Sequence, residues 1–547
     1  MNLDDLHDGG VDFESLDGGH RLGRRTFLMG ALATGALASA PVNYAAAARK
    51  RRLPLAKDGR FPLGVASGFP RPRGITLWTQ LDGVRGSKRL RLVVAKDRKF
   101  KNVVEERLVT ARKDRGHTAR TFVKGLKPDA RYYYRFVTED SKSPVGRFKT
   151  APPLNSNKPV RIAFYSCQNW EAGFFNAQRA IANEPDLDLV ISLGDYIYEY
   201  SNLDRFRPRQ DRTGNNKDGD VQLLGEYRQK YHLYKGDPDL KAMHAAHPFI
   251  SVWDDHEVED NNAGQNPSSA QPDPNRTNLR DYPRRVSYHQ RRENGYRAFF
   301  NYMPRSRFKG DRNRIFEDYR LGKTVDLMLT DERQYRDQQP CNDAILAPCG
   351  DVDDPNRTLL GAKQKQWLKE SLHASPARWK VWGTQLMLMG LRIGPTSEST
   401  AQVDAWDGYF AERKEILDFV IDSGVKDVVA VTGDIHTFFA GTATTTGDRN
   451  AGNRDAFPEF VGGAATSDGL PEATGLPPET LEVLVPFNGH LDFYEFTKKG
   501  YGLIEAGPNG LTCELKGVNH LAKDDPSTTT LAKYQVNPGD RVPHRIA

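Results

Sequence analysis

The chain has 547 residues, of which 38% are hydrophobic and 27% charged, enough apolar material for folded cores, so wholesale disorder is excluded. This length predicts two domains with additional segments, and four cysteines exclude a disulfide-rich scaffold. The formal net charge of +7 is a modest basic excess that suits a polyanionic substrate without identifying one.

The N-terminus has the pattern of an export signal. Arg21, Arg24 and Arg25 precede an apolar stretch at residues 26–37 that is too short to span a bilayer, and alanines at 45–47 offer a cleavage site. The run G-R-R-T-F-L-M resembles a twin-arginine signal, although Gly23 and Met29 depart from its usual pattern. We therefore expect residues 1–48 to be a twin-arginine signal peptide. The alternative is an uncleaved membrane anchor.

Cleavage of this segment would change the charge and the location of the protein. Residues 1–48 contain three arginines and six carboxylates, so their loss raises the formal net charge from +7 to +10. The twin-arginine machinery moves folded proteins, so a metal can be inserted before export. We expect a periplasmic or secreted protein with no stable membrane insertion after cleavage.

Residues 60–152 have the pattern of a small all-β domain. Apolar alternation over residues 74–81, 89–95 and 131–137 is separated by turn residues. The segment G-L-K-P-D-A-R-Y-Y-Y-R-F at 125–136 resembles the end of an immunoglobulin- or fibronectin-like sandwich, in which its tyrosines would be core and corner residues. A linker starting at Ala151 follows.

From residue 159 onward, short apolar runs end abruptly in polar residues. The runs are 160–165, 187–193, 249–253, 325–330 and 428–432, and helical patterns at 173–183, 363–372 and 412–422 lie among them. This alternation predicts buried strands of an α/β (α+β) layered-sheet domain over residues 159–514. We expect a C-terminal tail at 515–547 that packs on or near this domain, as a lid or against its core.

The strand ends of this domain carry metal-binding residue types. Since ligands of such sheets gather at the carboxyl ends of strands, these residues point to one site. The candidates are Cys167, Asp195, Tyr198, Asp255, Asp434 and His436. Carboxylates suit hard cations, imidazole suits transition metals, and a thiolate does not suit calcium or magnesium. The mixture predicts at least two unlike metal ions, which together can clamp a phosphoryl group.

Several motifs around these residues resemble one enzyme family. They are G-D-Y-I-Y, W-D-D-H-E-V-E-D-N-N-A-G, D-E-R-Q-Y-R-D-Q-Q-P-C, D-A-W-D-G-Y and G-D-I-H, with F-P-L-G-V-A-S-G-F-P-R-P-R-G-I-T-L-W-T-Q-L at 61–81. In this order they are similar to the PhoD family of alkaline phosphatases, from about residue 60 to about residue 510. The family also includes phosphodiesterases and enzymes with phospholipase D activity.

The resemblance implies a metallophosphatase site similar to that of the purple acid phosphatases, with no serine or cysteine nucleophile. It implies Fe³⁺ held by Cys167, Asp195, Tyr198 and His436, and one or two Ca²⁺ ions held by Asp195, Asp434 and Asn261 or Asp255. The family usually has an aromatic residue at the position of Asn262, and we select Asn261 as the amide ligand.

Two further residues are predicted to be catalytic. His256 either orients a neighbouring carboxylate or protonates the leaving group. Arg333 either neutralises a substrate phosphate or forms a structural salt bridge to Asp331 or Glu332. Asn488 and His490 are expected to close the site from the C-terminal side, and residues 406–409 resemble a family motif near it.

The remaining cysteines have other expected roles. Cys341 and Cys349, flanked by proline and glycine, predict a small disulfide loop, which an oxidising compartment permits. Cys513 has no evident partner and is expected to be buried.

The sequence therefore predicts an exported alkaline phosphatase in which a metal-activated oxygen nucleophile attacks phosphorus. The closest alternative is a phosphodiesterase or phospholipase D of the same family, acting on phospholipid or nucleic acid. A more remote alternative is an inactive secreted binding protein. The sequence contains no G-x-S-x-G nucleophile motif, P-loop or dinucleotide-binding fingerprint.

Overall fold

The computed structural model describes residues 53–201, 207–267, 284–344, 349–394, 396, 398–447 and 452–547. The predicted signal peptide lies outside these residues. Within these ranges, no helix combines the length and the apolar character needed to cross a bilayer.

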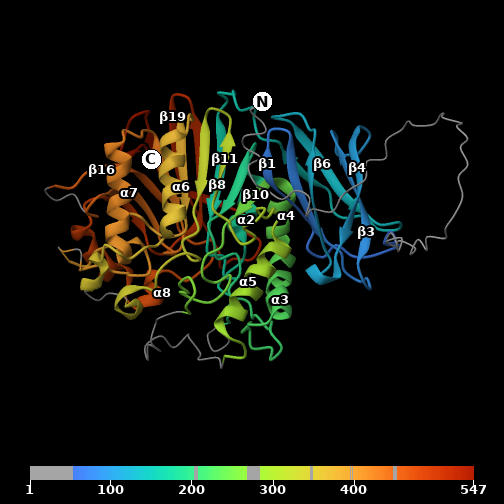
Figure 1. Ribbon diagram of the computed structural model, residues 1–547, viewed down its shortest axis with the longest axis horizontal. Coiled ribbons are helices and arrows are strands. Elements are labelled where there is room, and N and C mark those ends of the chain that lie inside the picture. The colour runs from blue at the N-terminus through green and yellow to red at the C-terminus, as the bar shows by residue number, and fades with distance from the viewer. Residues whose placement is uncertain are drawn as a thin grey trace, which may run out of the picture.

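A ten-stranded mixed sheet forms the larger half of the framework (Figure 1). Its strands, in spatial order, are β21 (His544–Arg545), β20 (Thr528–Val536), β19 (Gly510–Val518), β18 (Lys499–Gly507), β8 (Val160–Tyr165), β9 (Leu189–Ser192), β10 (Pro248–Ser251), β1 (Val65–Arg71), β2 (Gly74–Gln80) and β5 (Thr118–Lys124). Strands β8, β9, β10 and β1 are parallel neighbours, and the other pairs are antiparallel.

A seven-stranded mixed sheet forms the other half. Its order is β11 (Glu317–Leu321), β12 (Val325–Leu329), β13 (Trp379–Thr384), β14 (Val428–Thr432), β16 (Asp455–Gly462), β15 (Phe438–Thr444) and β17 (Leu491–Glu495). Strands β12, β13, β14 and β16 are parallel neighbours. The parallel strands are almost entirely buried, which is why the sequence shows them as continuous apolar runs.

Helices and turns cover and connect the sheets. The helices are α2 (Asn176–Asn183), α3 (Leu224–Gly236), α4 (Pro238–Ala246), α5 (Tyr288–Tyr302), α6 (Gly361–Ala374), α7 (Phe410–Asp422), α8 (Leu470–Thr474) and α9 (Pro478–Leu481). The 3₁₀ turns are η1 (Lys113–Arg115), η2 (Pro340–Asp343), η3 (Gly350–Asp353), η4 (Trp406–Tyr409) and η5 (Glu482–Phe487).

The two large sheets share one core. A single apolar cluster joins side chains of both sheets, among them Ile191 of β9 and Val381 of β13, together with Ile181 of α2. A second cluster packs Leu368 of α6 and Leu417 of α7 against the seven-stranded sheet. The layers follow one another in the order helices, sheet, sheet, helices. This arrangement confirms the predicted layered fold class.

The N-terminal strands do not form a separate pair of sheets. A four-stranded antiparallel sheet contains β4 (Val103–Ala111), β3 (Lys88–Ala95), β6 (Arg131–Val137) and β7 (Gly146–Lys149), and lies at one end of the molecule in Figure 1. The opposing strands β1, β2 and β5 belong to the ten-stranded sheet, because β1 pairs in parallel with β10. The sheet thus runs across the predicted 60–152 boundary, and the predicted division into domains stays a prediction. Tyr132 and Tyr134 are buried, as expected for core residues.

The C-terminal residues continue the same sheet. Strand β19 spans the predicted boundary at residue 515, and β20 and β21 form the sheet edge. These strands pack against the core and do not form a lid.

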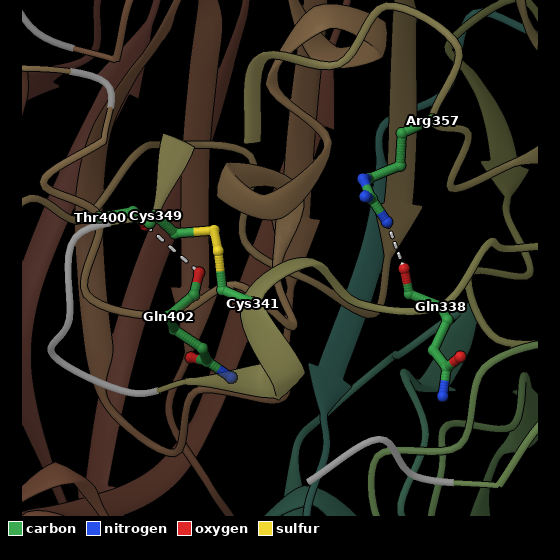
Figure 2. Close-up of a disulfide and its surroundings, with 6 residues drawn as sticks. All are labelled: Gln338, Cys341, Cys349, Arg357, Thr400 and Gln402. Carbon is green, nitrogen blue, oxygen red and sulfur yellow. Dashed lines mark hydrogen bonds between the residues drawn. A yellow bond between two sulfur atoms is a disulfide. The ribbon is translucent and has the colours of Figure 1, made fainter. Parts of the chain in front are cut away.

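The predicted disulfide between Cys341 and Cys349 is confirmed (Figure 2). It lies beside Thr400 and Gln402, and the backbone N–H of Cys349 donates to the carbonyl oxygen of Glu398. Cys513 is buried and free, as expected.

Candidate active site

The predicted site residues lie where the carboxyl ends of the parallel strands of both sheets meet. Cys167 follows β8, Asp195 follows β9, Asp255 follows β10 and Asp434 follows β14. The arrangement agrees with the rule that open α/β sheets carry their ligands at strand carboxyl ends.

The backbone of the site is strained. Five predicted metal-binding residues have a left-handed φ: Asn261 (50°), Asp195 (52°), Cys167 (56°), His436 (57°) and Asp434 (61°). A non-glycine residue in this region costs on the order of 1–3 kcal/mol, and such strain gathers at functional sites. The fold therefore holds these side chains in positions that local preference alone would not give.

A glycine permits the close approach of two site loops. Gly194 has φ +115°, and a Cβ atom there would lie 2.4 Å from the Cβ of Asp254. Any side chain at this position would push apart the loops after β9 and β10. Gly194 thus brings Asp195 against the neighbouring carboxylates.

One group of donors combines sulfur, oxygen and nitrogen. Ligand atoms of Cys167, Asp195 and His436 all lie within 4.8 Å of one another. The hydroxyl oxygen of Tyr198 lies 3.1 Å from Asp195 Oδ2 and 3.1 Å from His436 Nε2. The four residues predicted for the ferric ion are therefore together.

Carboxylates continue the site on its other side. Asp195, Asp255 and His256 form a second group, and Asp254, Asp255 and Asp434 form a third, each with ligand atoms within 4.8 Å of one another. Asp195 belongs to the first and second groups, and Asp255 to the second and third. The three groups thus form one continuous chain of donors.

The electrostatics of these donors favour bound cations. Burial raises the pKa of Asp195 and Asp434 well above the ordinary value, and that of Asp254 to about 6, with neighbouring carboxylates adding to each increase. Burial and the Asp195 carboxylate likewise raise the pKa of the Cys167 thiol.

Carboxylate oxygens without hydrogen-bond partners also favour bound cations. Asp195 Oδ1, Asp254 Oδ2 and Asp434 Oδ2 are buried and have no hydrogen-bond partner in the described part of the chain. A cation would bind these oxygens and keep the acidic donors ionised. The donor set therefore fits metal ions.

Arg333 lies inside the acidic cluster. Its Nε donates to Asp254 Oδ1, its Nη1 to Asp404 Oδ2 at 2.7 Å, and its Nη2 to Asp434 Oδ1 at 3.0 Å. The expected salt bridge to Asp331 or Glu332 is wrong.

Asp331 and Glu332 have other partners. Asp331 accepts hydrogen bonds from the indole of Trp253 and from Gln334, and Glu332 accepts from Thr330 and the backbone of Leu386. Both carboxylates are therefore engaged away from the guanidinium of Arg333.

His256 is fixed beside the first donor group. Its Nδ1 lies 2.8 Å from Glu199 Oε2, and its ring packs on Tyr198 with centroids 4.0 Å apart. Burial alone would lower the pKa of His256, but Asp255, Asp195 and Glu199 together raise it well above its ordinary value.

Asn261 lies at the edge of the carboxylate group. Its backbone N–H donates to Asp255 Oδ2 at 2.6 Å, and its side-chain nitrogen donates to Asp343. The neighbouring Asn262 directs its side-chain nitrogen to the carbonyl oxygen of Asp255 at 3.5 Å. The side-chain oxygen of Asn261 remains the candidate ligand.

Asn488 and His490, which were expected to close the site, contact the loop after β13 instead. Asn488 exchanges hydrogen bonds of 2.9 Å with the backbone of Arg392, and His490 bonds the carbonyl oxygen of Gly390 at 2.7 Å. They brace the loop after β13. The carboxylate of Asp407, in η4, accepts from the backbone of Leu391 and supports the same loop.

Several residues of the site were not predicted from the sequence. Asp254 lies in the motif W-D-D-H-E-V-E-D-N-N-A-G and Asp404 in the motif D-A-W-D-G-Y. Each motif contains more than one carboxylate, and this repetition could have indicated both residues. Glu257 accepts hydrogen bonds from the backbone of Asp195, Tyr196 and Asp254, and lies in the same motif as Asp254. Ser467, which contacts Tyr198, lies in no recognised motif.

Comparison with known proteins gives consistent matches over nearly the whole described chain. A family model described as PhoD-like phosphatase matches residues 162–515, and one described as the N-terminal domain of PhoD-like phosphatases matches residues 46–152. Alkaline phosphatase D of Bacillus subtilis (strain 168) is 32% identical over 491 residues, which cover 87% of this chain and 80% of that protein.

Solved structures agree with these matches. The structure of PhoD superposes with a TM-score of 0.78 at 30% identity, covering 89% of this chain and 92% of that one. The purple acid phosphatase PPD1 of yellow lupin (Lupinus luteus) seeds gives a TM-score of 0.55 at 12% identity, covering 87% of this chain and 73% of that one, a likeness of fold alone.

Proposed function

The chain belongs to the PhoD-like phosphatase family and is a phosphoric ester hydrolase, and from this premise we propose that it hydrolyses phosphate monoesters at a centre containing Fe³⁺ and Ca²⁺. One observation carries the choice of metals. Donors suited to a trivalent transition metal (Cys167, Tyr198 and His436) share Asp195 with a group of carboxylates suited to a hard cation.

The proposed ligands divide into two sets. Cys167, Asp195, Tyr198 and His436 would hold Fe³⁺, and Asp195, Asp255, Asn261 and Asp434 would hold Ca²⁺. When bound, such ions neutralise the charge of the phosphoryl group and lower the pKa of water, so that an oxygen nucleophile is available at ordinary pH.

Arg333 is best suited to positioning. It is 1% exposed, and each of its three guanidinium nitrogen atoms already donates to a carboxylate. A substrate phosphate would have to displace one of these carboxylates to reach it. We infer that Arg333 orients Asp254 and Asp434 while offsetting their mutual repulsion. This role replaces direct contact with the substrate phosphate.

His256 keeps two alternatives. Glu199 holds its Nδ1, and its Nε2 lies 3.7 Å from Asp260 Oδ1. A ring nitrogen lies within 4.8 Å of carboxylate oxygens of Asp195 and Asp255, so the ring can either orient these carboxylates or donate a proton to the leaving group. His256→Asn separates them. A larger loss for esters of poor leaving groups than of good ones supports proton donation, and an equal loss supports orientation.

The experiment that tests the metal assignment compares two buried free cysteines, Cys167 and Cys513. We expect the purified enzyme to contain iron and calcium and to show a visible thiolate or phenolate charge-transfer band. Cys167→Ala should lose the iron and the charge-transfer band, and its activity should fall by about 100-fold. Cys513→Ala should retain the iron, the band and the activity. A colourless, fully active enzyme that tolerates Cys167→Ala would exclude iron, and activity that survives calcium chelation would exclude calcium.

Phosphodiester hydrolysis is the second candidate, favoured by the basic charge of +7. Activity toward p-nitrophenyl phosphate and bis(p-nitrophenyl) phosphate, measured at equal metal content, decides between them. A higher kcat/KM for the diester would replace the monoester proposal.

Export by the twin-arginine route is proposed from residues 1–48. Substitution of both Arg24 and Arg25 by lysine should leave the protein in the cytoplasmic fraction. Unchanged export of this variant would exclude the route.

A further inference from the structure

A cluster of arginines lies where the N-terminal strands meet the C-terminal end of α5. Its members are Arg112, Arg115, Arg120, Arg297 and Arg307. None of them belongs to the donor groups of the candidate active site. Strand β4, which leads into the cluster, and α5 are labelled in Figure 1.

Three of these arginines line a small open hollow. Arg112, Arg115 and Arg120 surround it together with the hydroxyl-bearing Thr110 and Thr118. Phe300 and Asn301, both in α5, also line it. The hollow is therefore lined by residues that carry guanidinium, hydroxyl and amide groups, together with one aromatic residue.

Carboxylates compensate part of the positive charge of this cluster, and Glu293 acts on Arg307. Asp114, in the turn between β4 and β5, is already engaged by Arg112 through two hydrogen bonds of 3.1 Å. Its carbonyl oxygen accepts from Arg297 at 3.5 Å. Within the described ranges, no carboxylate forms an ion pair with Arg120, Arg297 or Arg307.

Arg120 shows this imbalance most clearly. Its Nη1 donates to the carbonyl oxygens of Phe300 at 2.7 Å and Met303 at 3.3 Å, but its buried Nε has no partner among the described residues. Burial, Arg115 and Arg307 lower the pKa of Arg120 to about 9.

Arg307 is in a similar state. It stacks 4.1 Å above the Phe300 ring, and burial, Arg312 and Arg115 lower its pKa to about 10. The positively charged guanidinium groups of the cluster repel one another, and an anion that binds between them relieves this repulsion.

We propose that this hollow is a second anion site, which binds a tetrahedral oxyanion of the phosphate type. Guanidinium groups suit such a ligand because their planar N–H donors match two oxygens at once. The oxyanion has two possible sources, free phosphate or an additional phosphate group of a large substrate.

The first test uses inorganic sulfate as the probe and thermal unfolding of the metal-loaded enzyme as the readout. Ionic strength is kept constant with sodium chloride, because general screening alters surface electrostatics. The variants are Arg307→Gln and the double variant Arg115→Gln/Arg307→Gln. Arg91→Gln is the control. Arg91 of β3 forms an exposed ion pair with Glu106 of β4 in the four-stranded sheet, and it does not belong to the arginine cluster.

Sulfate should raise the Tm of the wild type and of Arg91→Gln equally. The increase should fall to about half or less in the double variant, since a ligand stabilises a protein only through its remaining sites. Without sulfate, Arg307→Gln should unfold no earlier than the wild type, because it relieves repulsion. Equal sulfate effects in all variants, or a lower Tm of Arg307→Gln without sulfate, would overturn the proposal.

A second measurement identifies the source of the anion, and this one rests on the proposed function. KM of the double variant is compared with KM of the wild type, first for p-nitrophenyl phosphate and then for a nucleoside triphosphate, at matched free metal. An increase of about threefold or more for the triphosphate alone assigns the site to a substrate phosphate, because one lost charged contact weakens binding on this scale. Unchanged KM values with a reduced sulfate effect assign it to free oxyanion. Absence of activity toward both substrates would count against the proposed function, while the Tm result still decides the anion site.

Discussion

At the scale of single residues, the donors of the site are held by hydrogen bonds to uncharged groups, a hydroxyl and a backbone carbonyl. Ser467 Oγ lies 2.7 Å from the Tyr198 hydroxyl and 2.8 Å from the carbonyl oxygen of Cys167. The adjacent Asp468 accepts through its carbonyl oxygen from His436 Nδ1, which leaves His436 Nε2 facing Tyr198. Two consecutive residues thus orient three proposed iron ligands.

Ser467→Ala should therefore alter the metal centre without removing a ligand. We expect the phenolate charge-transfer band to shift and the affinity for iron to fall by about 10- to 100-fold, the usual effect of losing a hydrogen bond to a ligand. Absorption spectra and iron titration measure both. Thr466→Val is the control, because Thr466 bonds the carbonyl oxygen of Asn169 instead of a ligand. An unchanged band in Ser467→Ala would contradict this role.

The proposed ligands could be predicted from the sequence, but Ser467 could not. Asp195 and Asp434 each follow an apolar run and a glycine, so their place at a strand end was readable from the sequence. Ser467 reaches Tyr198 across 269 positions of the chain, and no local pattern reports such a contact. Arg333 illustrates the same limit, since its partners lie 71, 79 and 101 positions away.

A second residue-scale feature is the buried Lys235. Its Nζ lies 3.2 Å from the Tyr196 hydroxyl, 3.3 Å from His244 Nε2 and 4.7 Å from the Trp78 ring centroid. Burial lowers the pKa of Lys235 to about 7. The unfolded chain, with an ordinary lysine pKa, therefore binds an additional proton between about pH 7 and pH 10.

This difference predicts that stability rises with pH in that interval because of Lys235. Lys235→Met should be more stable than the wild type at pH 7, by on the order of 2–4 kcal/mol, and should lose this advantage toward pH 10. Differential scanning calorimetry of both proteins across this range tests the difference. Lys235→Arg should be less stable than the wild type throughout, since arginine stays charged. A constant difference between Lys235→Met and wild type would contradict the prediction.

At the scale of elements, the residues on either side of Cys341 contact the site. Asp343, two residues after Cys341, accepts a hydrogen bond from the side chain of Asn261. Gln339, two residues before Cys341, donates to the carbonyl oxygen of Asn261 at 2.8 Å and to Asp404 at 2.6 Å. The disulfide thus fixes the segment that holds the proposed amide ligand.

Replacing Cys341 and Cys349 together by serine should raise the calcium concentration required for half-maximal activity. The entropic contribution of so short a loop is only about 2–3 kcal/mol, so the folded protein should remain available for measurement. Calcium titrations of activity compare this variant with Cys513→Ala, in which a cysteine of β19 outside the loop is replaced. An equal calcium requirement in both variants would show that the disulfide does not position Asn261.

The elements themselves were readable to different extents. Buried strands such as β8 and β14 coincide with predicted apolar runs, because a strand covered on both faces needs apolar residues throughout. The pairing of β1 with β10 was not readable, since its partners lie about 180 residues apart and nothing in either strand specifies the other. The two-sheet arrangement of the N-terminal region was consequently expected to be more independent than it is.

At the scale of the whole molecule, this pairing makes the N-terminal strands part of the main core. Trp78 of β2 is fully buried, and its indole N–H donates to the carbonyl oxygen of Asn301 in α5 at 2.9 Å. Its side chain belongs to the same apolar cluster as Ile191 of β9 and Val381 of β13. We therefore expect the N-terminal and C-terminal parts to unfold together.

Trp78→Ala tests this coupling. A buried tryptophan replaced by alanine costs roughly 3–5 kcal/mol, which for a chain of this size corresponds to a decrease in Tm of about 4 °C. If the parts are coupled, calorimetry shows one transition in the wild type and one, shifted as a whole, in the variant. Val103→Ala, which alters a side chain 46% exposed on β4, should leave the transition in place. Two transitions, of which Trp78→Ala shifts only one, would mean that the N-terminal strands unfold on their own despite the continuous sheet.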